Sequence, residues 1–250
     1  KALDAGVNTL EMDVVISNDI RVVVSHEPYF SHEIATGPDG EEITQKTELT
    51  YNIYRMNYND IKMFDVGLKP HPRFPDQKKA AAIKPLLVDV IEAVEAYVEE
   101  HELESPNYNI ELKRQADYDH TYHPNANIFS KLVLQVLSVM NIEDRTTLQA
   151  FDISTLQKLR ELNPEVPLAL LVENDMSITE NINALGFKPD VYSPNFKLID
   201  TETVTYCKLE EIKIIAWTVN KEADIRHMID LGVDGIISDY PDRVIDILTE

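Results

Sequence analysis

The chain has 250 residues, of which 44% are hydrophobic and 27% are charged, so it is long enough to bury a large core as one domain or as two smaller ones. Its formal net charge of −21 repels phosphate backbones and anionic bilayers, and no basic patch in the sequence reverses that field. We therefore expect no nucleic-acid partner. No apolar run approaches the length of a membrane span, so we expect no stable membrane insertion. The single cysteine, Cys207, excludes an internal disulfide.

The start of the chain indicates the end of a helix followed by a β-hairpin. The stretch KALDAG is typical of a last helical turn capped by Gly6, and TLEMDVVI (9–16) and RVVVSH (21–26) are two apolar runs. The few residues between these runs cannot make a parallel crossover, so the runs must pair antiparallel. Because the chain opens inside a helix, we expect that an upstream segment belongs to the same domain.

The hairpin gathers a histidine and two acids if its turn has two residues. A two-residue turn at Asn18–Asp19 puts His26 directly opposite Glu11. Alternation puts Asp13 on the same face of the strand as Glu11, and directly opposed residues share a face. This register predicts a cluster of two carboxylates and an imidazole.

Residues 27–84 follow the hairpin and contain many turn formers and aromatic residues. The segment is too long for an ordinary connection between a strand and a helix. We interpret it as a small insertion over one rim of the fold.

From residue 85 onward, apolar runs alternate with helical patterns, which indicates βα units around a parallel sheet. Strands are expected at 108–113, 146–151, 168–172, 190–195, 214–219 and 235–239. Helices are expected at 85–101, 127–140, 154–163, 177–186, 201–211, 221–232 and 241–250.

With the strand at 9–16, this count gives seven strands, one short of a closed (β/α)8 TIM barrel. Since the chain opens at the tail of a helix, we expect the first strand and most of the first helix to lie upstream of this numbering. The sequence thus predicts an α/β fold, with residues 1–250 as a single, N-terminally incomplete TIM-barrel domain.

Glu11 and Asp13 stand near the mouth of the expected barrel, where such barrels carry their active sites. Two carboxylates on one inward face repel each other unless a positive charge lies between them. A divalent cation suits this role, and ligation by oxygen alone favours Ca²⁺ or Mg²⁺ over zinc. The alternative interpretation is a pair of solvated acids on the surface of a hairpin.

A second pair has the same spacing at the end of the next strand, in NIELK. Glu111 there is a candidate third metal ligand, and Lys113 offers the positive charge that an anionic substrate needs in an acidic protein. The alternative is a Glu–Lys pair without chemistry. Near the end of a later strand, Trp217 is either a core residue or an aromatic wall against a small ligand.

As a set, the segments GVNTLEMDVVISNDIRVVVSHEP, NIELK, AWTVN and GVDGIISDYPD resemble the glycerophosphodiester phosphodiesterase family. They occur in the family's order and nearly over the whole chain. The resemblance implies a (β/α)8 barrel with a small insertion after the hairpin that carries the histidine. It also implies metal-dependent hydrolysis of glycerophosphodiesters to glycerol 3-phosphate and an alcohol.

Carried over by position, the resemblance implies a role for each candidate residue. It implies that Glu11, Asp13 and Glu111 are metal ligands and that His26 is one of two acid/base histidines. It also implies that Lys113 contacts the phosphate and that Trp217 forms a wall on the glycerol side.

The sequence also departs from the family pattern. The family's first motif, a His-Arg-Gly strand followed by Pro-Glu-Asn, is absent, and with it one catalytic histidine and an arginine. Glu27 replaces the usual aspartate after the histidine, and Gln149 and Ala150 stand where the family often has a serine-containing strand. Two alternatives stay open: a phosphodiesterase acting on sphingomyelin or lysophospholipid, a choice that the insertion would set, or, if the upstream His-Arg motif is truly missing, an inactive barrel that binds glycerophosphodiesters.

Two further expectations concern the rim and the compartment. His120 and His123 have a spacing that metal sites use, but we interpret them as part of a solvated rim. The segment HPRFPDQKK and the tyrosine-rich insertion resemble family members that bacteria export, so we expect a periplasmic or secreted location. The sequence does not indicate an oligomeric state.

Overall fold

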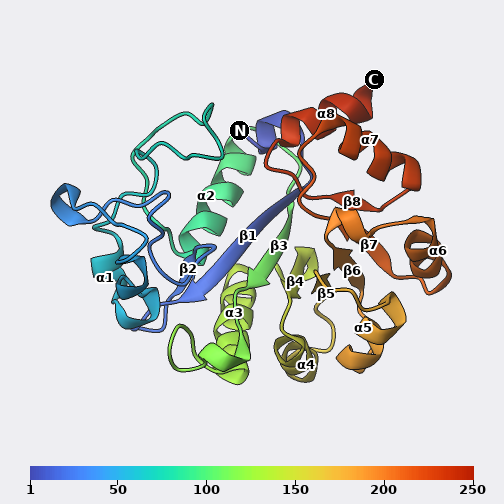
Figure 1. Ribbon diagram of the computed structural model, residues 1–250, viewed down its shortest axis with the longest axis horizontal. Coiled ribbons are helices and arrows are strands. Elements are labelled where there is room, and N and C mark those ends of the chain that lie inside the picture. The colour runs from blue at the N-terminus through green and yellow to red at the C-terminus, as the bar shows by residue number, and fades with distance from the viewer. The chain divides into compact units, whose positions relative to one another are not determined.

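A computed structural model describes residues 1–250, and eight strands form its sheet (Figure 1). The strands are β1 (Thr9–Ile16), β2 (Val22–Val24), β3 (Asn107–Leu112), β4 (Thr146–Ala150), β5 (Leu168–Val172), β6 (Val191–Pro194), β7 (Lys213–Ala216) and β8 (Gly235–Ile236). Their order is β2-β1-β3-β4-β5-β6-β7-β8. β1 and β2 pair antiparallel, and each pair from β3 to β8 is parallel. The α/β fold with parallel βα units that the sequence predicts is confirmed.

A helix follows each parallel strand from β3 onward, as the periodicity predicts (Figure 1). The α-helices are α1 (Tyr58–Ile61), α2 (Leu87–Glu100), α3 (Ala126–Met140), α4 (Ile153–Leu162), α5 (Ile178–Leu185), α6 (Thr201–Leu209), α7 (Glu222–Leu231) and α8 (Pro241–Thr249). Local chemistry sets their ends: Asp152 accepts a hydrogen bond from the backbone N–H of Thr155, and Ser177 and Glu180 form a capping box at the start of α5. These side chains satisfy N–H groups that the helix itself leaves without a partner.

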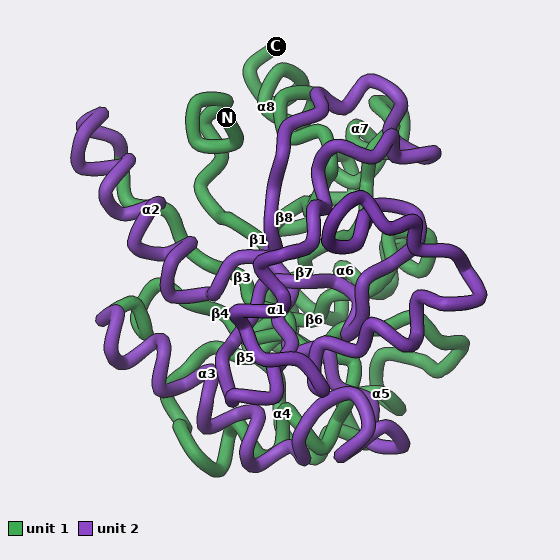
Figure 2. The backbone as a smooth tube through the Cα atoms, turned by 90° about the vertical axis from the view of Figure 1, so that its left-hand side faces the viewer, with its two compact units in different colours: residues 1–11, 104–111, 142–250 green, residues 12–103, 112–141 purple.

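The chain divides into two compact units (Figure 2). Unit 1 comprises residues 1–11, 104–111 and 142–250, and unit 2 comprises residues 12–103 and 112–141. Unit 1 contains β4 to β8. Every residue of β5 is buried, as expected for a parallel strand that is covered on both faces.

Residues 27–84 give unit 2 a hydrophobic core of its own, although they contain only α1 and three 3-10 turns, Pro38–Gly40, Glu48–Thr50 and Ile53–Arg55. Phe30 and Phe64 stack with their ring centroids 3.9 Å apart. Val15 and Val23 of the hairpin belong to the same buried cluster. The segment therefore packs against the hairpin, while its interpretation as an insertion over a barrel rim stays a prediction.

The hairpin differs from the expected register by one residue. Val14 pairs with Val24 and Ile16 with Val22, so His26 is not opposite Glu11 and that expectation is wrong. The backbone N–H of Ile20 donates to Ser17 O, and Ile20 has a φ of 56°. This is the three-residue turn, in which a residue in the left-handed region follows a β-turn. The extra turn residue shifts the pairing by one position.

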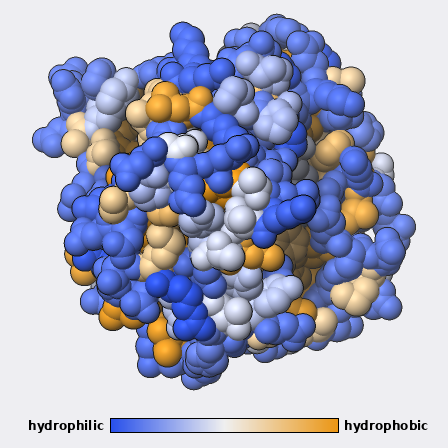
Figure 3. All heavy atoms as spheres, turned by 60° about the vertical axis from the view of Figure 1, so that its left-hand side comes forward, coloured by the Kyte–Doolittle hydropathy of each residue, from blue (hydrophilic) through white to orange (hydrophobic).

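One face of the molecule is mostly hydrophilic. On the face shown in Figure 3, hydrophobic residues are scattered among hydrophilic ones. None of the helices combines the length and the apolarity that are needed to cross a bilayer.

The strained turn residue generates a stability prediction. Ile20 is 62% exposed and holds a left-handed backbone conformation that costs a residue with a Cβ about 1–2 kcal/mol. Because little packing is lost on truncation, Ile20→Gly should raise the free energy of unfolding by about 1 kcal/mol. Urea denaturation measures this change. Ile20→Val, which keeps the branched Cβ, is the control and should not gain stability; a loss of stability in Ile20→Gly would contradict the prediction.

Candidate functional site

Three carboxylates gather on the polar face of β1 and β3. Glu11 and Asp13 are two residues apart on one continuous strand, so their side chains share a face. Glu111 is only 7% exposed, between Ile110 and Leu112, which are buried. One carboxylate oxygen from each of Glu11, Asp13 and Glu111 lies within 4.8 Å of the other two. An all-oxygen set of this kind fits a hard divalent cation.

In unit 1, two buried amides adjoin these acids. Gln149 of β4 is 2% exposed, and its Nε2 donates to Glu11 Oε1 at 2.8 Å. Asn109 of β3 is 4% exposed, and its Nδ2 donates to Gln149 Oε1 at 3.0 Å. In the sequence, Gln149 is marked only as a departure from the family pattern, and Asn109 stands in the segment NIELK without a role of its own. Polar residues at alternate positions of otherwise apolar strands were the signal that could have found both.

In unit 2, His26 pairs with its chain neighbour. His26 Nδ1 lies 2.8 Å from Glu27 Oε1, and this hydrogen bond raises the pKa of His26. Burial pushes the pKa of Glu27 upward, but the bond to His26 and the positive charges of His26 and Lys84 outweigh it and lower that pKa. The opposite ring nitrogen, Nε2, lies 3.4 Å from Lys113 Nζ. The hydrogen bond to Glu27 therefore orients the His26 imidazole through Nδ1.

Lys113 also faces an acid of β1. Its Nζ lies 3.7 Å from Asp13 Oδ1, and both side chains are mostly buried. The structure thus brings His26, Lys113 and Asp13 together, although by a different register from the one expected. Lys113 therefore places a positive charge next to Asp13, and its contact with an anionic substrate stays a prediction.

A second lysine of unit 2, Lys84, escaped the sequence analysis. It is 4% exposed, donates to Ser25 Oγ and lies 5.4 Å from the centroid of the Phe30 ring. Ser25 Oγ in turn donates to the carbonyl oxygen of Glu27. Burial lowers the pKa of Lys84 to about 8. No motif signalled this residue because burial of a lysine depends on tertiary packing.

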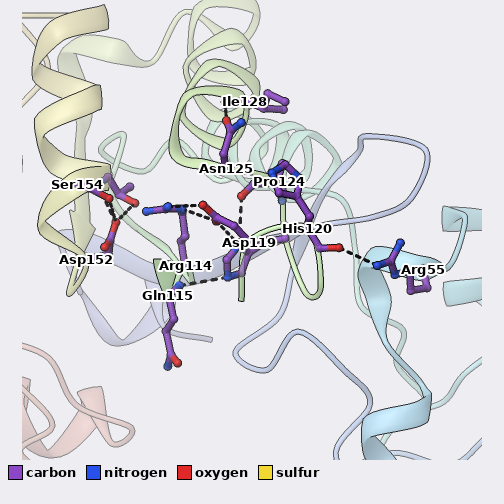
Figure 4. A network of polar contacts seen from close by, with 12 residues as sticks. Arg55, Arg114, Gln115, Asp119, His120, Pro124, Asn125, Ile128, Asp152 and Ser154 are labelled. Carbon is purple, nitrogen blue, oxygen red and sulfur yellow. Dashed lines mark hydrogen bonds and ion pairs between the residues drawn. The ribbon is translucent and has the colours of Figure 1, made fainter. Parts of the chain in front are cut away.

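Two buried side chains, Arg114 and His123, fix the loop after Lys113; Figure 4 shows Arg114 facing Asp119. Arg114 makes two hydrogen bonds to Asp119, of 2.8 and 2.6 Å. His123 Nε2 accepts from the backbone N–H of Gln115, and His123 is 2% exposed. The expectation of a solvated His123 is therefore wrong, because the imidazole satisfies backbone groups inside the loop. His120 is exposed, as expected.

Trp217 belongs to unit 1 and is half-buried. Its indole Nε1 donates to Ser193 O at 2.7 Å, and its ring meets Phe151 edge-on at a centroid distance of 5.4 Å. Both contacts orient the indole plane. Its assignment to the glycerol side of a substrate stays a prediction.

Comparison with known proteins gives one consistent family. The family model described as "Glycerophosphoryl diester phosphodiesterase family" matches residues 1–243. A glycerophosphodiester phosphodiesterase of Bacillus altitudinis is 28% identical over 254 residues, which cover 100% of this chain and 89% of that protein.

Solved structures agree with this match. A Silicibacter pomeroyi DSS-3 protein assigned as a glycerophosphoryl diester phosphodiesterase is 28% identical and superposes with a TM-score of 0.84, covering 99% of this chain and 86% of that one. An Oleispira antarctica phosphodiesterase, solved in complex with the product sn-glycerol-3-phosphate, has 21% identity and a TM-score of 0.75, with coverage of 99% and 87%. At that lower identity the likeness concerns the fold.

The buried lysine generates a prediction about pH. The pKa of Lys84 falls from 10.5 in the unfolded chain to about 8 in the folded chain. Between pH 8 and pH 10.5 the unfolded chain therefore binds more protons than the folded chain. The free energy of unfolding consequently rises with pH across this range. Relative to Lys84→Met, the wild-type free energy of unfolding should rise by about 3 kcal/mol across it. Urea titrations at several pH values measure the difference. The control is Lys131→Met at an exposed position of α3, and its difference in stability from the wild type should not depend on pH. If the stability of the wild type and of Lys84→Met changed in parallel with pH, the lowered pKa of Lys84 would be refuted.

Proposed function

Because the chain belongs to the glycerophosphoryl diester phosphodiesterase family, whose model matches residues 1–243, we propose that it uses a divalent cation and His26 to hydrolyse glycerophosphodiesters. The products are glycerol 3-phosphate and an alcohol. The chain is thus a phosphoric diester hydrolase, and the cation and the roles of individual residues are the proposal. The observation that carries it is the approach of three carboxylates within 4.8 Å.

Glu11, Asp13 and Glu111 are the residues proposed to hold the cation. Their donor atoms are all carboxylate oxygens, which suit Ca²⁺ or Mg²⁺ better than zinc. When bound, such an ion supplies charge stabilisation to phosphoryl oxygens. The burial of Glu111 supports this assignment, since a buried carboxylate beside two others needs a compensating charge.

His26 is proposed to move a proton at Nε2. Glu27 accepts the hydrogen bond at Nδ1 and thereby fixes which ring nitrogen points away from the pair. The raised pKa of His26 keeps a larger fraction of the ring protonated near neutral pH, as an acid that protonates a departing alkoxide requires. The proton passes to the oxygen whose bond to phosphorus breaks as water adds to that phosphorus.

Lys113 and Trp217 are proposed to bind the substrate. Lys113 Nζ lies beside both His26 and Asp13, so its charge is positioned for an anionic phosphodiester that a chain of net charge −21 would otherwise repel. The product bound in the Oleispira antarctica phosphodiesterase, sn-glycerol-3-phosphate, supports the assignment of a glycerol-containing substrate. Trp217 would provide an apolar wall for the glycerol carbons. A periplasmic or secreted location is also part of the proposal.

The first test of this function is metal dependence. Glycerophosphocholine should yield glycerol 3-phosphate, EDTA should stop the reaction, and Ca²⁺ or Mg²⁺ should restore it. Because the cation contributes several kcal/mol of charge stabilisation, Glu11→Gln should lower kcat/KM by more than about 100-fold. A coupled assay for glycerol 3-phosphate measures both effects.

The matched control is Glu92→Gln, at an exposed position of α2, which should keep wild-type activity. Full activity of Glu11→Gln, or of the wild type in EDTA, would exclude the proposed metal chemistry. Assays with intact sphingomyelin and lysophosphatidylcholine beside the deacylated compound test the alternative substrates. Absence of turnover on all three compounds would favour the inactive binding barrel.

The second test concerns the His26–Glu27 pair. If protonated His26 is the acid, kcat/KM falls as pH rises through its pKa. Glu27→Gln removes the carboxylate that raises this pKa, so the falling limb should move to lower pH. The control is Glu48→Gln, which breaks a comparable pair with His32, 2.6 Å from Nδ1 to Oε2, and should leave the limb in place. A shift of the Glu27→Gln limb to higher pH would contradict the assignment.

A further inference from the structure

We propose that Gln149, held by Asn109, is a positioning residue that fixes the Glu11 carboxylate and thereby sets the affinity of the site for its cation. This inference rests on the proposed function, because it needs Glu11 to be a metal ligand. It gives a role to Gln149, which lies outside the segments that carry the resemblance, and to Asn109, which opens the segment NIELK but has no role assigned there. All of the contacts that carry it lie within unit 1.

The hydrogen bonds give the Gln149 amide one orientation. Asn109 Nδ2 is a donor and lies 3.0 Å from Gln149 Oε1, so the oxygen of the amide must face Asn109. The amide nitrogen then faces Glu11 Oε1 at 2.8 Å. A reversed amide would place two donors together at Asn109 and two acceptors together at Glu11. The Glu11 carboxylate can only accept, so it sets this orientation, and Asn109 supports the orientation by donating to the amide oxygen of Gln149.

The sheet holds this relay in place. Glu111 of β3 pairs in register with Gln149 of β4, and Asn109 pairs with Thr147. Asn109 and Glu111 are two residues apart and share a face of β3. The amide of Gln149 is thus carried by a strand next to the one that supplies a proposed ligand. Because both amides are nearly fully buried, they have little rotational freedom.

A neutral N–H that donates to an ionised carboxylate makes a charge-assisted hydrogen bond, which is shorter and stronger than a neutral one. The bond directs Gln149 at one oxygen of Glu11 and restrains the plane of its carboxylate. Hydrogen bonds of this type from residues behind the ligands typically account for 10–100-fold of a metal's affinity. Gln149 is placed to make such a contribution without touching the cation.

Stability alone explains the two amides poorly. Asn109 Oδ1 is buried and has no hydrogen-bond partner, and an unsatisfied buried acceptor costs about 1–3 kcal/mol. The adjacent residues Ile110 and Leu148 are fully buried apolar side chains, so these strands accommodate aliphatic residues readily. An apolar pair in place of Asn109 and Gln149 would avoid this cost. A polar relay that weakens the core is expected where it positions a reacting group.

The experiment compares cation binding by wild type and Gln149→Met, which keeps the length of the side chain and loses the donor. Isothermal titration with Ca²⁺ and with Mg²⁺ gives the Kd of each folded protein. We expect Gln149→Met to weaken binding of the preferred cation 10–100-fold and to recover activity as the cation concentration rises. A Kd within twofold of the wild type would overturn the inference.

The control is Thr147→Val, on the same strand and face but without a contact to Glu11 in the relay, and its Kd should be unchanged. Asn109→Leu provides a second route if Gln149→Met does not fold. Since Asn109 acts through Gln149, Asn109→Leu should weaken binding alone but add no further loss in a Gln149→Met background. Independent losses that add would identify a general packing effect and would contradict the relay.

The same titrations separate this inference from the proposed function. If the wild type binds neither cation, the proposed metal site fails and the role of Gln149 fails with it. If the wild type binds a cation and the Gln149 and Asn109 variants bind it equally well, only the relay fails.

Discussion

Mutual repulsion among three carboxylates is the constraint on which the candidate site depends. Two unit charges 4 Å apart repel by about 4 kcal/mol at the effective dielectric constant of a protein surface, and Glu11, Asp13 and Glu111 lie within 4.8 Å of one another. Partial compensation comes from Lys113 Nζ, 3.7 Å from Asp13, and from the amide of Gln149 at Glu11. A cation bound between the carboxylates would remove the remaining repulsion, which is the physical reason for proposing a metal site here.

The polar groups of the candidate site and those behind it occupy buried positions where aliphatic side chains are usual. On β3, Asn109 and Glu111 alternate with Ile110 and Leu112, which are almost fully buried. The alternation lets one face carry chemistry while the other face packs under the helices. In unit 2, Lys84 plays a related part, because its buried charge faces Ser25 and the Glu27 that holds His26. Both units therefore place buried polar groups behind the residues proposed to act on substrate.

Much of the fold and of the candidate site follows from the sequence pattern. The expected strand at 168–172 coincides with β5, and the expected helix at 154–163 differs from α4 by one residue at each end. The same pattern identified the carboxylates, because i, i+2 spacing within a strand fixes a shared face. The geometry of the hairpin was harder to predict from the sequence. Ile20 adopts a left-handed conformation that branched residues rarely take. A two-residue turn was therefore the natural expectation, and it gave the wrong pairing for His26.

The sequence by itself determined the order of strands and helices, the face that carries Glu11 and Asp13, and the family to which the chain belongs. These features depend on local periodicity and on the spacing of residues along one strand. Tertiary structure decided which distant groups meet: Asn109 with Gln149 across neighbouring strands, Lys84 with Ser25, and His123 with the backbone of its own loop. Contacts between residues far apart in the chain, and the burial of single polar side chains, arise only when the packed elements exclude water from them.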